Sequence, residues 1–289
     1  MLFVRDKGRL CNNILQYGHA YAWGREHGRE TMSMRFAYKY QYFRICHTRW
    51  HWPWLYVVAK LSAAVGLLPK IGFHDVDEQS GQPVAASHAA NEQLMLNCRH
   101  ALVEGWYIRF YDLFIKYKAE ILSLFAFDDA IVDAVQTYLQ EQSAHDMALS
   151  AVKLGVHIRR GDYQTFCNGR YYYTDDEYIS MIKAFCLAHD EPVTVYLCTN
   201  DTQLDRDYYS RELSGICRVA PMLVGRNNEA LDLCLLSECD HIVGPPSTFS
   251  LVAAMYHDCP LLWMHTADPA LVSDAKAWGY FDEMFRHIV

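Results

Sequence analysis

The sequence is poor in glycine and proline, and it has no low-complexity tract and no long uncharged hydrophobic run. Glycine and proline together make up 24 of its 289 residues, which argues against a disordered or fibrous chain. The longest apolar stretch, Trp54 to Leu68, is interrupted by Lys60 and is too short to cross a bilayer. The first residues carry charge where a signal peptide has an apolar core. We therefore expect a soluble, cytoplasmic protein that can still associate peripherally with the inner face of a membrane.

The chain also lacks an excess of basic residues. It has 26 Lys and Arg against 34 Asp and Glu, a formal net charge of −8. Affinity for nucleic acid depends on clustered basic residues, so no nucleic-acid partner is expected. A phosphate-binding G-x-x-x-x-G-K-[ST] loop is absent as well, which disfavours a kinase or sulfotransferase. A small phosphorylated ligand remains possible, because it needs only a local basic pocket.

No pair among the ten cysteines has the CxxC spacing of a zinc or redox site. Most of them lie in apolar runs, as Cys198 and Cys234 do, which is typical of buried free thiols. The cysteines therefore indicate a reduced, cytoplasmic setting in place of a disulfide framework.

The first half of the chain is less regular than the second. A strand at Leu2–Val4 precedes a helix from Leu10 to His27 and a strand at Thr31–Phe36. An aromatic-rich region follows, whose rings can stack on sugars or simply pack in a core. Helices are expected over 111–125 and 129–141, and residues 142–147 are the linker candidate.

From residue 152 onward, strands and helices alternate strictly, which predicts an α/β fold with a parallel sheet covered on both faces. The expected strands are 152–160, 193–199, 216–220, 241–243 and 260–264, and the expected helices are 175–188, 201–213, 228–239 and 247–257, followed by two C-terminal helices. Ligands bind such sheets at the carboxyl ends of the strands. The chemistry is therefore expected just after residues 160, 199 and 243.

The most informative segment is Gly155–Tyr163, which ends in His157-Ile158-Arg159-Arg160-Gly161-Asp162-Tyr163. Strand alternation puts His157 and Arg159 on one face and Arg160 on the other, unless the turn at Gly161 rotates it. Guanidinium groups match the paired oxygens of a diphosphate. The competing interpretation is an ion pair between Asp162 and one of the two arginines.

A second candidate phosphate site begins at Pro245-Pro246-Ser247-Thr248-Phe249-Ser250. The prolines end a strand, and Ser247 is a suitable N-cap for the helix that follows. The free amides of that first turn, from Thr248, Phe249 and Ser250, can bind a diphosphate. Helix capping alone is the alternative.

Four segments in the same order resemble the bacterial α-1,2-fucosyltransferases. His157–Tyr163 is similar to the family's HxRRGDY, and Gly8–Tyr17 to its G-x-L-G-N-Q-x-F-Q-Y, with Cys11 and Asn13 in place of Gly and Gln. The other two segments are Val103–Tyr111, similar to G-Y-x-Q-S-x-x-Y-F, and Leu231–Val243, similar to D-L-x-L-M-S-x-C-x-H-x-I-I.

This resemblance implies a GT-B-like fold, with two Rossmann-type domains facing a cleft and C-terminal helices packing back. Residues 1–145 would bind the acceptor, and residues 146–289 would bind GDP-fucose. The implied reaction is metal-independent transfer of L-fucose, with inversion, to a hydroxyl such as galactose O2 of a glycan. Arg159 or Arg160 would hold the β-phosphate, with His157 near the nucleotide.

Two further features stay open at the level of sequence. Asn200 and Asp201 follow a strand at the same rim, where a carboxylate can accept from guanine; alternatively, one of them caps the next helix. Asp75-Val76-Asp77 matches a metal-binding DxD triplet, which also arises often by chance.

The mechanism needs positive charge at the leaving diphosphate, supplied by Arg159, Arg160 and the helix start at Ser247. Asp162 is the first candidate for a catalytic base, and Glu177 and His19 are others. A related transferase for another GDP-sugar, or a non-catalytic nucleotide-sugar binding protein, is the alternative function.

Overall fold

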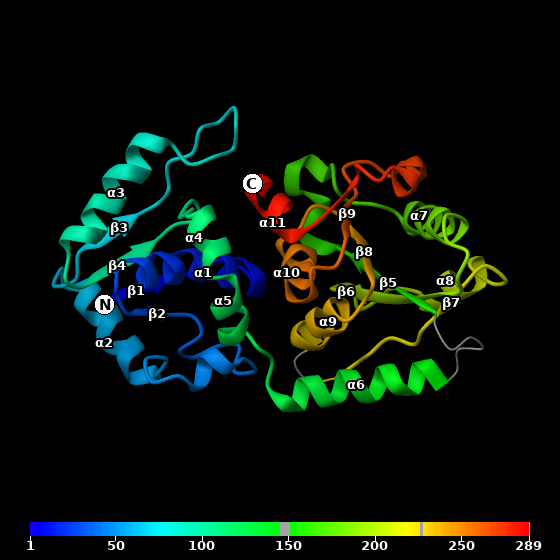
Figure 1. Ribbon diagram of the computed structural model, residues 1–289, viewed down its shortest axis with the longest axis horizontal. Helices are drawn as coiled ribbons and strands as arrows, with labels where there is room; N and C mark the ends of the chain where they lie inside the picture. The colour runs from blue at the N-terminus through cyan, green and yellow to red at the C-terminus, as the bar shows by residue number, and fades with distance from the viewer. Residues whose placement is uncertain (145–150, 226–227, 289) are drawn as a thin grey trace. The chain divides into compact units, whose positions relative to one another are not determined.

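The computed structural model describes residues 1–144, 151–225 and 228–288, which form two compact units (Figure 1). Unit 1 comprises Met1–Asp128, and unit 2 comprises Asp129–Ile288. Helix α6 (Asp129–Ala144) packs against α9 (Asn228–Ser237) and so belongs to unit 2. The boundary expected at residue 145 and half of the linker candidate, residues 145–147, lie outside the described residues. The other linker residues, Gln142 to Ala144, end α6.

Unit 1 contains a four-stranded parallel sheet in the order β2-β1-β4-β3. Its strands are β1 (Leu2–Arg5), β2 (Thr31–Ser33), β3 (Lys70–Gly72) and β4 (Ala101–Glu104). Phe3, Met32 and Leu102 lie side by side in register and form one apolar patch on this sheet. The first two strands were expected from the sequence, whereas β3 and β4 were not.

The helices of unit 1 are α1 (Leu10–Glu26), α2 (Pro53–Ala64), α3 (Ala85–Asn97), α4 (Tyr111–Lys116) and α5 (Lys118–Leu124). The single helix expected over 111–125 is two helices, separated at Tyr117. Core packing holds for part of the aromatic region, and stacking on sugars stays a prediction for the exposed rings. Phe36 and Phe43 are buried against Phe125, while others in the region are exposed.

Unit 2 contains a six-stranded sheet in the order β10-β9-β8-β5-β6-β7, in which only β10 is antiparallel to its neighbour. The strands are β5 (Val152–Ile158), β6 (Val193–Thr199), β7 (Arg218–Val219), β8 (His241–Gly244), β9 (Leu261–Trp263) and β10 (Trp278–Gly279). The predicted α/β architecture with two Rossmann-type units is confirmed.

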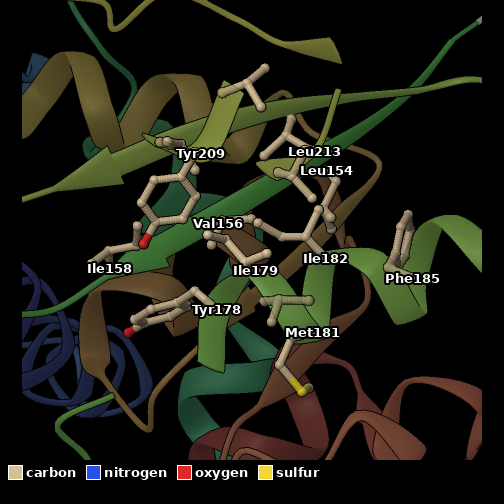
Figure 2. Close-up of a cluster of buried hydrophobic side chains, with 14 of the residues drawn as sticks. Leu154, Val156, Ile158, Tyr178, Ile179, Met181, Ile182, Phe185, Tyr209 and Leu213 are labelled. Carbon is tan, nitrogen blue, oxygen red and sulfur yellow. The ribbon is translucent and has the colours of Figure 1, made fainter. Parts of the chain in front are cut away.

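The two faces of the unit 2 sheet are covered by different helices. Leu154, Val156 and Ile158 point toward α7 (Asp175–Leu187) and α8 (Arg206–Glu212), where they form the core in Figure 2. On the opposite face, a Cβ at Gly155 would lie 2.7 Å from the Leu236 side chain of α9. Helix α10 (Thr248–His257) contacts α9, and the short C-terminal helix α11 (Phe281–Met284) packs against α10.

A buried carboxyl group, that of Asp6, connects the end of β1 to the end of β2. Asp6 follows β1, and its Oδ1 accepts a hydrogen bond from the Arg35 amide at 3.0 Å while Oδ2 accepts one from the Ser33 hydroxyl. Burial raises the pKa of Asp6 from 3.8 to about 7, although both hydrogen bonds act to lower it. Desolvation therefore outweighs the hydrogen bonds, and the protonated form is favoured in the folded state.

We expect the free energy of unfolding to fall as the pH rises from 3.8 to about 7, because over this range the unfolded chain releases the Asp6 proton while the folded protein retains it. This contribution is fully present only below the unfolded pKa of 3.8. The Asp6→Asn variant removes the titration, so its stability should decline less between about pH 5 and about pH 8. Urea denaturation at the two pH values measures the difference. Asp77→Asn, at an exposed turn, is the control; an equal decline in wild type and Asp6→Asn would contradict the expectation.

Candidate functional site

The carboxyl ends of β5, β6 and β8 meet at one edge of the unit 2 sheet. From β5 the chain passes to β6 and β7 on one side, and it later returns to β8 and β9 on the other. The gap between β5 and β8 is therefore a topological switch point, the usual ligand site of such sheets. The segments singled out from the sequence after residues 160, 199 and 243 all lie at this edge.

His157 lies on the face of the sheet that α10 covers. Its ring stacks on Phe249 with 5.1 Å between ring centres and 30° between planes. Burial, followed by the positive charge of Arg159, lowers the pKa of His157 to about 3, so the imidazole is neutral at physiological pH. Its Nδ1 is buried and has no hydrogen-bond partner among the described residues. A buried polar atom without a partner is costly, which makes Nδ1 a candidate contact for a ligand.

The ends of β5 and β8 approach unusually closely. A Cβ at Gly244 would lie 2.8 Å from the His157 carbonyl oxygen and 2.9 Å from the His157 Cβ. Only glycine allows this approach, because backbone and Cβ atoms cannot give way as a flexible side-chain end can. Gly244 thus places the start of the Pro245–Ser247 loop directly beside the end of β5.

Arg159 is on the same face as His157, as strand alternation predicted. Its Nη2 donates to Oδ2 of Asp162 at 3.0 Å, and its guanidinium carbon lies 5.3 Å from the centre of the Tyr163 ring. The side chain is 11% exposed, and its Nε is buried with no partner within the described part of the chain. The guanidinium is therefore held in place while one buried N–H group remains to be satisfied.

Tyr163 links the turn after β5 to the loop before α10. Gly161 opens this turn with a φ of 65°, a conformation that glycine adopts readily. The Tyr163 hydroxyl then donates to the Pro246 carbonyl at 2.6 Å. The ring that supports Arg159 is thus fixed to the segment that precedes α10, a role that sequence reasoning did not assign.

Arg160 points to the opposite face of the sheet, as alternation predicted. Its guanidinium donates to the Tyr173 carbonyl and to the carboxylate of Asp175, the first residue of α7. The alternative of an ion pair with Asp162 therefore holds for Arg159. Arg160 pairs with Asp175 instead. Asp175 was not singled out as a partner, although the T-x-x-E pattern around it marks a helix start.

The carboxylate of Asp175 also accepts from the Tyr209 hydroxyl of α8 at 2.7 Å. One acidic group therefore joins β5, α7 and α8. Arg160 and Asp175 are 9% and 36% exposed, so water screens the pair only on the side of the acid.

Asn200 and Asp201 hold the end of β6 against the end of β5. The Asn200 Oδ1 accepts from the Arg160 amide at 2.8 Å, and its Nδ2 donates to the Arg160 carbonyl at 3.3 Å. Asp201 Oδ1 accepts from the Gln203 amide at 2.9 Å, and its Oδ2 lies 4.0 Å from Nε of Arg160. The suggestion that either residue caps the next helix is wrong, because α8 begins later and Asp205 is its N-cap.

The first turn of α10 faces the same edge. The Ser247 hydroxyl accepts from the Phe249 amide at 3.2 Å, which confirms Ser247 as the N-cap. Thr248 and Phe249 are partly exposed, whereas Ser250 is fully buried and hydrogen-bonded to the Ser247 carbonyl and to Trp263. The first amides of a helix lack intrahelical acceptors, so this end offers donors and a positive dipole.

Asp232 on α9 is a further residue near this edge that sequence reasoning missed. Cys198 lies opposite His157 in the sheet register, and its thiol donates to the Asp232 carbonyl at 3.7 Å. Asp232 therefore lies on the face that carries His157. It is 8% exposed, and burial raises its pKa to about 7. Two features of the sequence mark this position: Asp232 is an acidic residue inside the apolar run Leu231–Leu236, and it matches the first residue of the D-L-x-L-M-S pattern.

The other candidate bases and the possible metal triplet have local structural roles. Glu177 completes a capping box with Thr174 at the start of α7. In unit 1, His19 accepts from the Phe110 amide at 3.1 Å, and burial holds its pKa well below the usual value. Asp77 accepts from the amides of a turn at residues 79 and 80. Across the described ranges, no group of three or more His, Cys, Asp or Glu residues is arranged to hold a metal ion.

The sequence profile of glycosyl transferase family 11 matches residues 99–258, more than half of the chain. This chain belongs to glycosyl transferase family 11. The match covers β5, β6 and β8 together with the start of α10, so the geometry described above is that of a family 11 glycosyltransferase. No curated protein matches the chain by sequence.

Solved structures resemble this family 11 glycosyltransferase over most of its length. A mutant of Arabidopsis thaliana FUT1 in complex with GDP has a TM-score of 0.61 at 13% identity and covers 96% of this chain and 73% of its own. POFUT1 in complex with GDP-fucose has a TM-score of 0.59 at 10% identity, covering 89% of this chain and 94% of its own. At such low identities the likeness supports the GT-B-like fold.

The two arginines should differ in their effect on stability. Arg160→Ala leaves Asp175 without its charged partner, so we expect a loss of about 2–3 kcal/mol in the free energy of unfolding. Arg159→Ala releases only a half-exposed Asp162 and should cost less than about 1 kcal/mol. Urea denaturation of both variants checks the order. An equal loss, or a larger loss for Arg159→Ala, would contradict the assignment of Arg160 to the α7 face.

Proposed function

We propose that this family 11 glycosyltransferase moves L-fucose from GDP-fucose to a hydroxyl of a glycan, with inversion at the sugar carbon. The observation that carries the proposal is the pair of buried, unsatisfied nitrogens, Nδ1 of His157 and Nε of Arg159, beside the N-terminus of α10. Neutral and charged donors at a helix start suit a diphosphate. The similar structures of FUT1 and POFUT1 are complexes with GDP and with GDP-fucose. This supports the same donor for the present chain.

In this proposal the diphosphate lies between the end of β5 and the start of α10. Arg159 supplies a charge-assisted hydrogen bond, and the first turn from Ser247 to Ser250 supplies amides and a dipole. Arg160 contributes through its position, because its pair with Asp175 and its backbone bonds to Asn200 fix the strand end. These groups stabilise the negative charge that develops on GDP as the bond to the sugar breaks.

Guanine recognition requires an acceptor for its N1–H and amino groups. Asp201 follows β6 at the same edge, but its Oδ1 already caps a turn. Asp232 lies on the His157 face, and no hydrogen bond in the described residues accounts for its carboxylate. We therefore assign the guanine contact to Asp232, with Asp201 as the alternative carboxylate. A buried acceptor of this kind selects strongly against a base that leaves it unpaired.

Chemically, the acceptor oxygen forms a bond to the anomeric carbon while the bond from that carbon to the β-phosphate oxygen breaks. The electron pair leaves with GDP, and the hydroxyl proton passes to a base. Asp162 is the proposed base, since its carboxylate is 46% exposed beside Arg159.

Unit 1 is proposed to bind the acceptor, with galactose O2 of a glycan as the acceptor hydroxyl. The protein is proposed to act in the cytoplasm, peripheral to a membrane.

Nucleotide release from different donors tests this function. We expect release from GDP-fucose, about a hundredfold weaker release from GDP-mannose because an apolar pocket rejects an added hydroxyl only modestly, and none from UDP-sugars. Release should persist in excess EDTA, since Arg159 and the α10 amides supply the positive charge. Preference for a UDP-sugar would contradict the donor. GDP binding without release in the presence of diverse glycans would indicate a non-catalytic binding protein.

Calorimetry on Arg159→Ala accompanies this assay. Loss of one charge-assisted hydrogen bond should weaken GDP binding about tenfold or more. Arg211→Ala, at an exposed position on α8, is the matched control and should bind GDP as the wild type does.

The dependence of GDP affinity on pH tests the guanine contact. Because the pKa of Asp232 is raised to about 7, the carboxylate form becomes available as the pH rises through that value. Wild-type affinity should therefore increase between about pH 6 and about pH 8 by more than that of Asp232→Asn. Asp201→Asn should follow the wild type. If Asp201→Asn loses the increase and Asp232→Asn keeps it, the contact belongs to Asp201.

A further inference from the structure

One long segment of unit 1 contains no acidic residue. Residues 31–74 carry six Lys and Arg and not one Asp or Glu, which leaves 20 basic against 34 acidic side chains in the rest of the chain. The same segment contains Trp50, Trp52 and Trp54 and the helix α2. A chain with a net charge of −8 thus concentrates basic residues, tryptophan and apolar residues in one stretch of its sequence.

Helix α2, labelled in Figure 1, packs one face against the sheet of unit 1. Ala59 and Ala63 are buried, and Leu55 and Tyr56 pack beside them on the patch formed by Phe3, Met32 and Leu102. Positions 55, 59 and 63 follow helical spacing, so a single stripe makes this contact. The core needs no other face of α2.

The opposite face of α2 is apolar and exposed. Trp54 is 78% exposed, Val58 58% and Leu61 60%, and the stripe continues past the helix end with Val65 and Leu67. Trp54, Val58, Leu61 and the C-cap residue Val65 follow one another at intervals of three or four residues, so they share one side of the helix, and Leu67 lies just beyond the helix end. We name these five residues, together with their exposed neighbours Trp52 and Val57, the α2 surface. A helix that is apolar on two opposite faces has a second partner besides its own core.

Basic side chains flank the α2 surface and rest on aromatic rings. Lys60 of α2 lies 5.8 Å from the centre of the Tyr56 ring, which contacts the Tyr38 ring in a tilted arrangement, with 4.7 Å between centres and 40° between planes. Arg35 contacts Tyr38 in turn, at 5.9 Å from the ring centre. Arg35, Tyr38, Tyr56 and Lys60 therefore form a continuous basic and aromatic strip beside the apolar stripe.

We propose that the α2 surface binds the headgroup region of an anionic lipid bilayer. Tryptophan and tyrosine favour the boundary between headgroups and acyl chains, and each basic residue is attracted to anionic lipid. At 12 residues, α2 is about 18 Å long, so it lies in the interface. No helix in the described residues is long and apolar enough to span a bilayer. A second copy of this chain is disfavoured as the partner, because two basic segments would then face each other.

This inference does not depend on the donor or acceptor assigned above, so its test can fail or succeed separately. Full-length protein is sedimented with vesicles of phosphatidylcholine, and with vesicles in which part of that lipid is replaced by phosphatidylglycerol. We expect stronger binding to the anionic vesicles, weakened by salt. Trp54→Ser combined with Leu61→Ser should reduce the partition at least about tenfold. Both side chains are exposed, so the fold should be retained, which circular dichroism and thermal unfolding verify.

The control variants distinguish binding through the α2 surface from nonspecific hydrophobic or electrostatic adsorption to the vesicles. Leu187→Ser removes another apolar side chain, 86% exposed on α7, and should leave the partition unchanged. Lys60→Glu should weaken binding to anionic vesicles about tenfold with little effect on neutral ones, while Lys276→Glu at an exposed site should change it far less. Equal binding by the Trp54/Leu61 variant and the wild type would overturn the proposal. The proposal would also be overturned if the wild type did not bind vesicles but formed a dimer that the Trp54/Leu61 variant could not form.

Discussion

The alternation of side chains along β5 is the constraint on which unit 2 depends. Leu154, Val156 and Ile158 form the core with α7, and Arg160 continues that series into a pair with Asp175. The intervening positions, Gly155, His157 and Arg159, lie on the face that α9 and α10 cover. Gly155 leaves space for the Leu236 side chain of α9. One strand therefore places the ion-paired Arg160 on one face and Arg159, the proposed diphosphate contact, on the other. A shift of one residue in register would exchange the two roles.

The second half of the fold could be predicted closely because its elements are strongly periodic. Strand β6 has the expected ends, and the expected positions of β5, β8 and α10 differ from the observed ones by a few residues at most. In unit 1, β3 and β4 escaped prediction, since each has only three or four residues and lies in the sheet through a distant partner. Strand β4 pairs with β1 about a hundred residues away, and no local pattern encodes that pairing.

At the candidate site, the sequence predicted the segments but not all of their partners. The faces of Arg159 and Arg160 follow from alternation, and the Ser247 cap follows from local helix-start chemistry. The partner of Arg160 does not, because Asp175 reaches it only after the chain has turned beyond Tyr163 and Tyr173. The position of Asp232 close to the strand ends depends in the same way on the packing of α9 against β6. Side chains brought together by tertiary packing carry no spacing signal in the sequence.

The shared carboxylate of Asp175 also bears on local opening of unit 2. Because it accepts from both Arg160 and Tyr209, α8 cannot detach without disturbing the end of β5. Amide hydrogens at the end of β5 and the start of α7 should therefore exchange with solvent as one cooperative unit with α8. Helix α8 is only seven residues long, too short to be stable alone. A marginal helix near the edge of the sheet thus limits how long the end of β5 stays ordered.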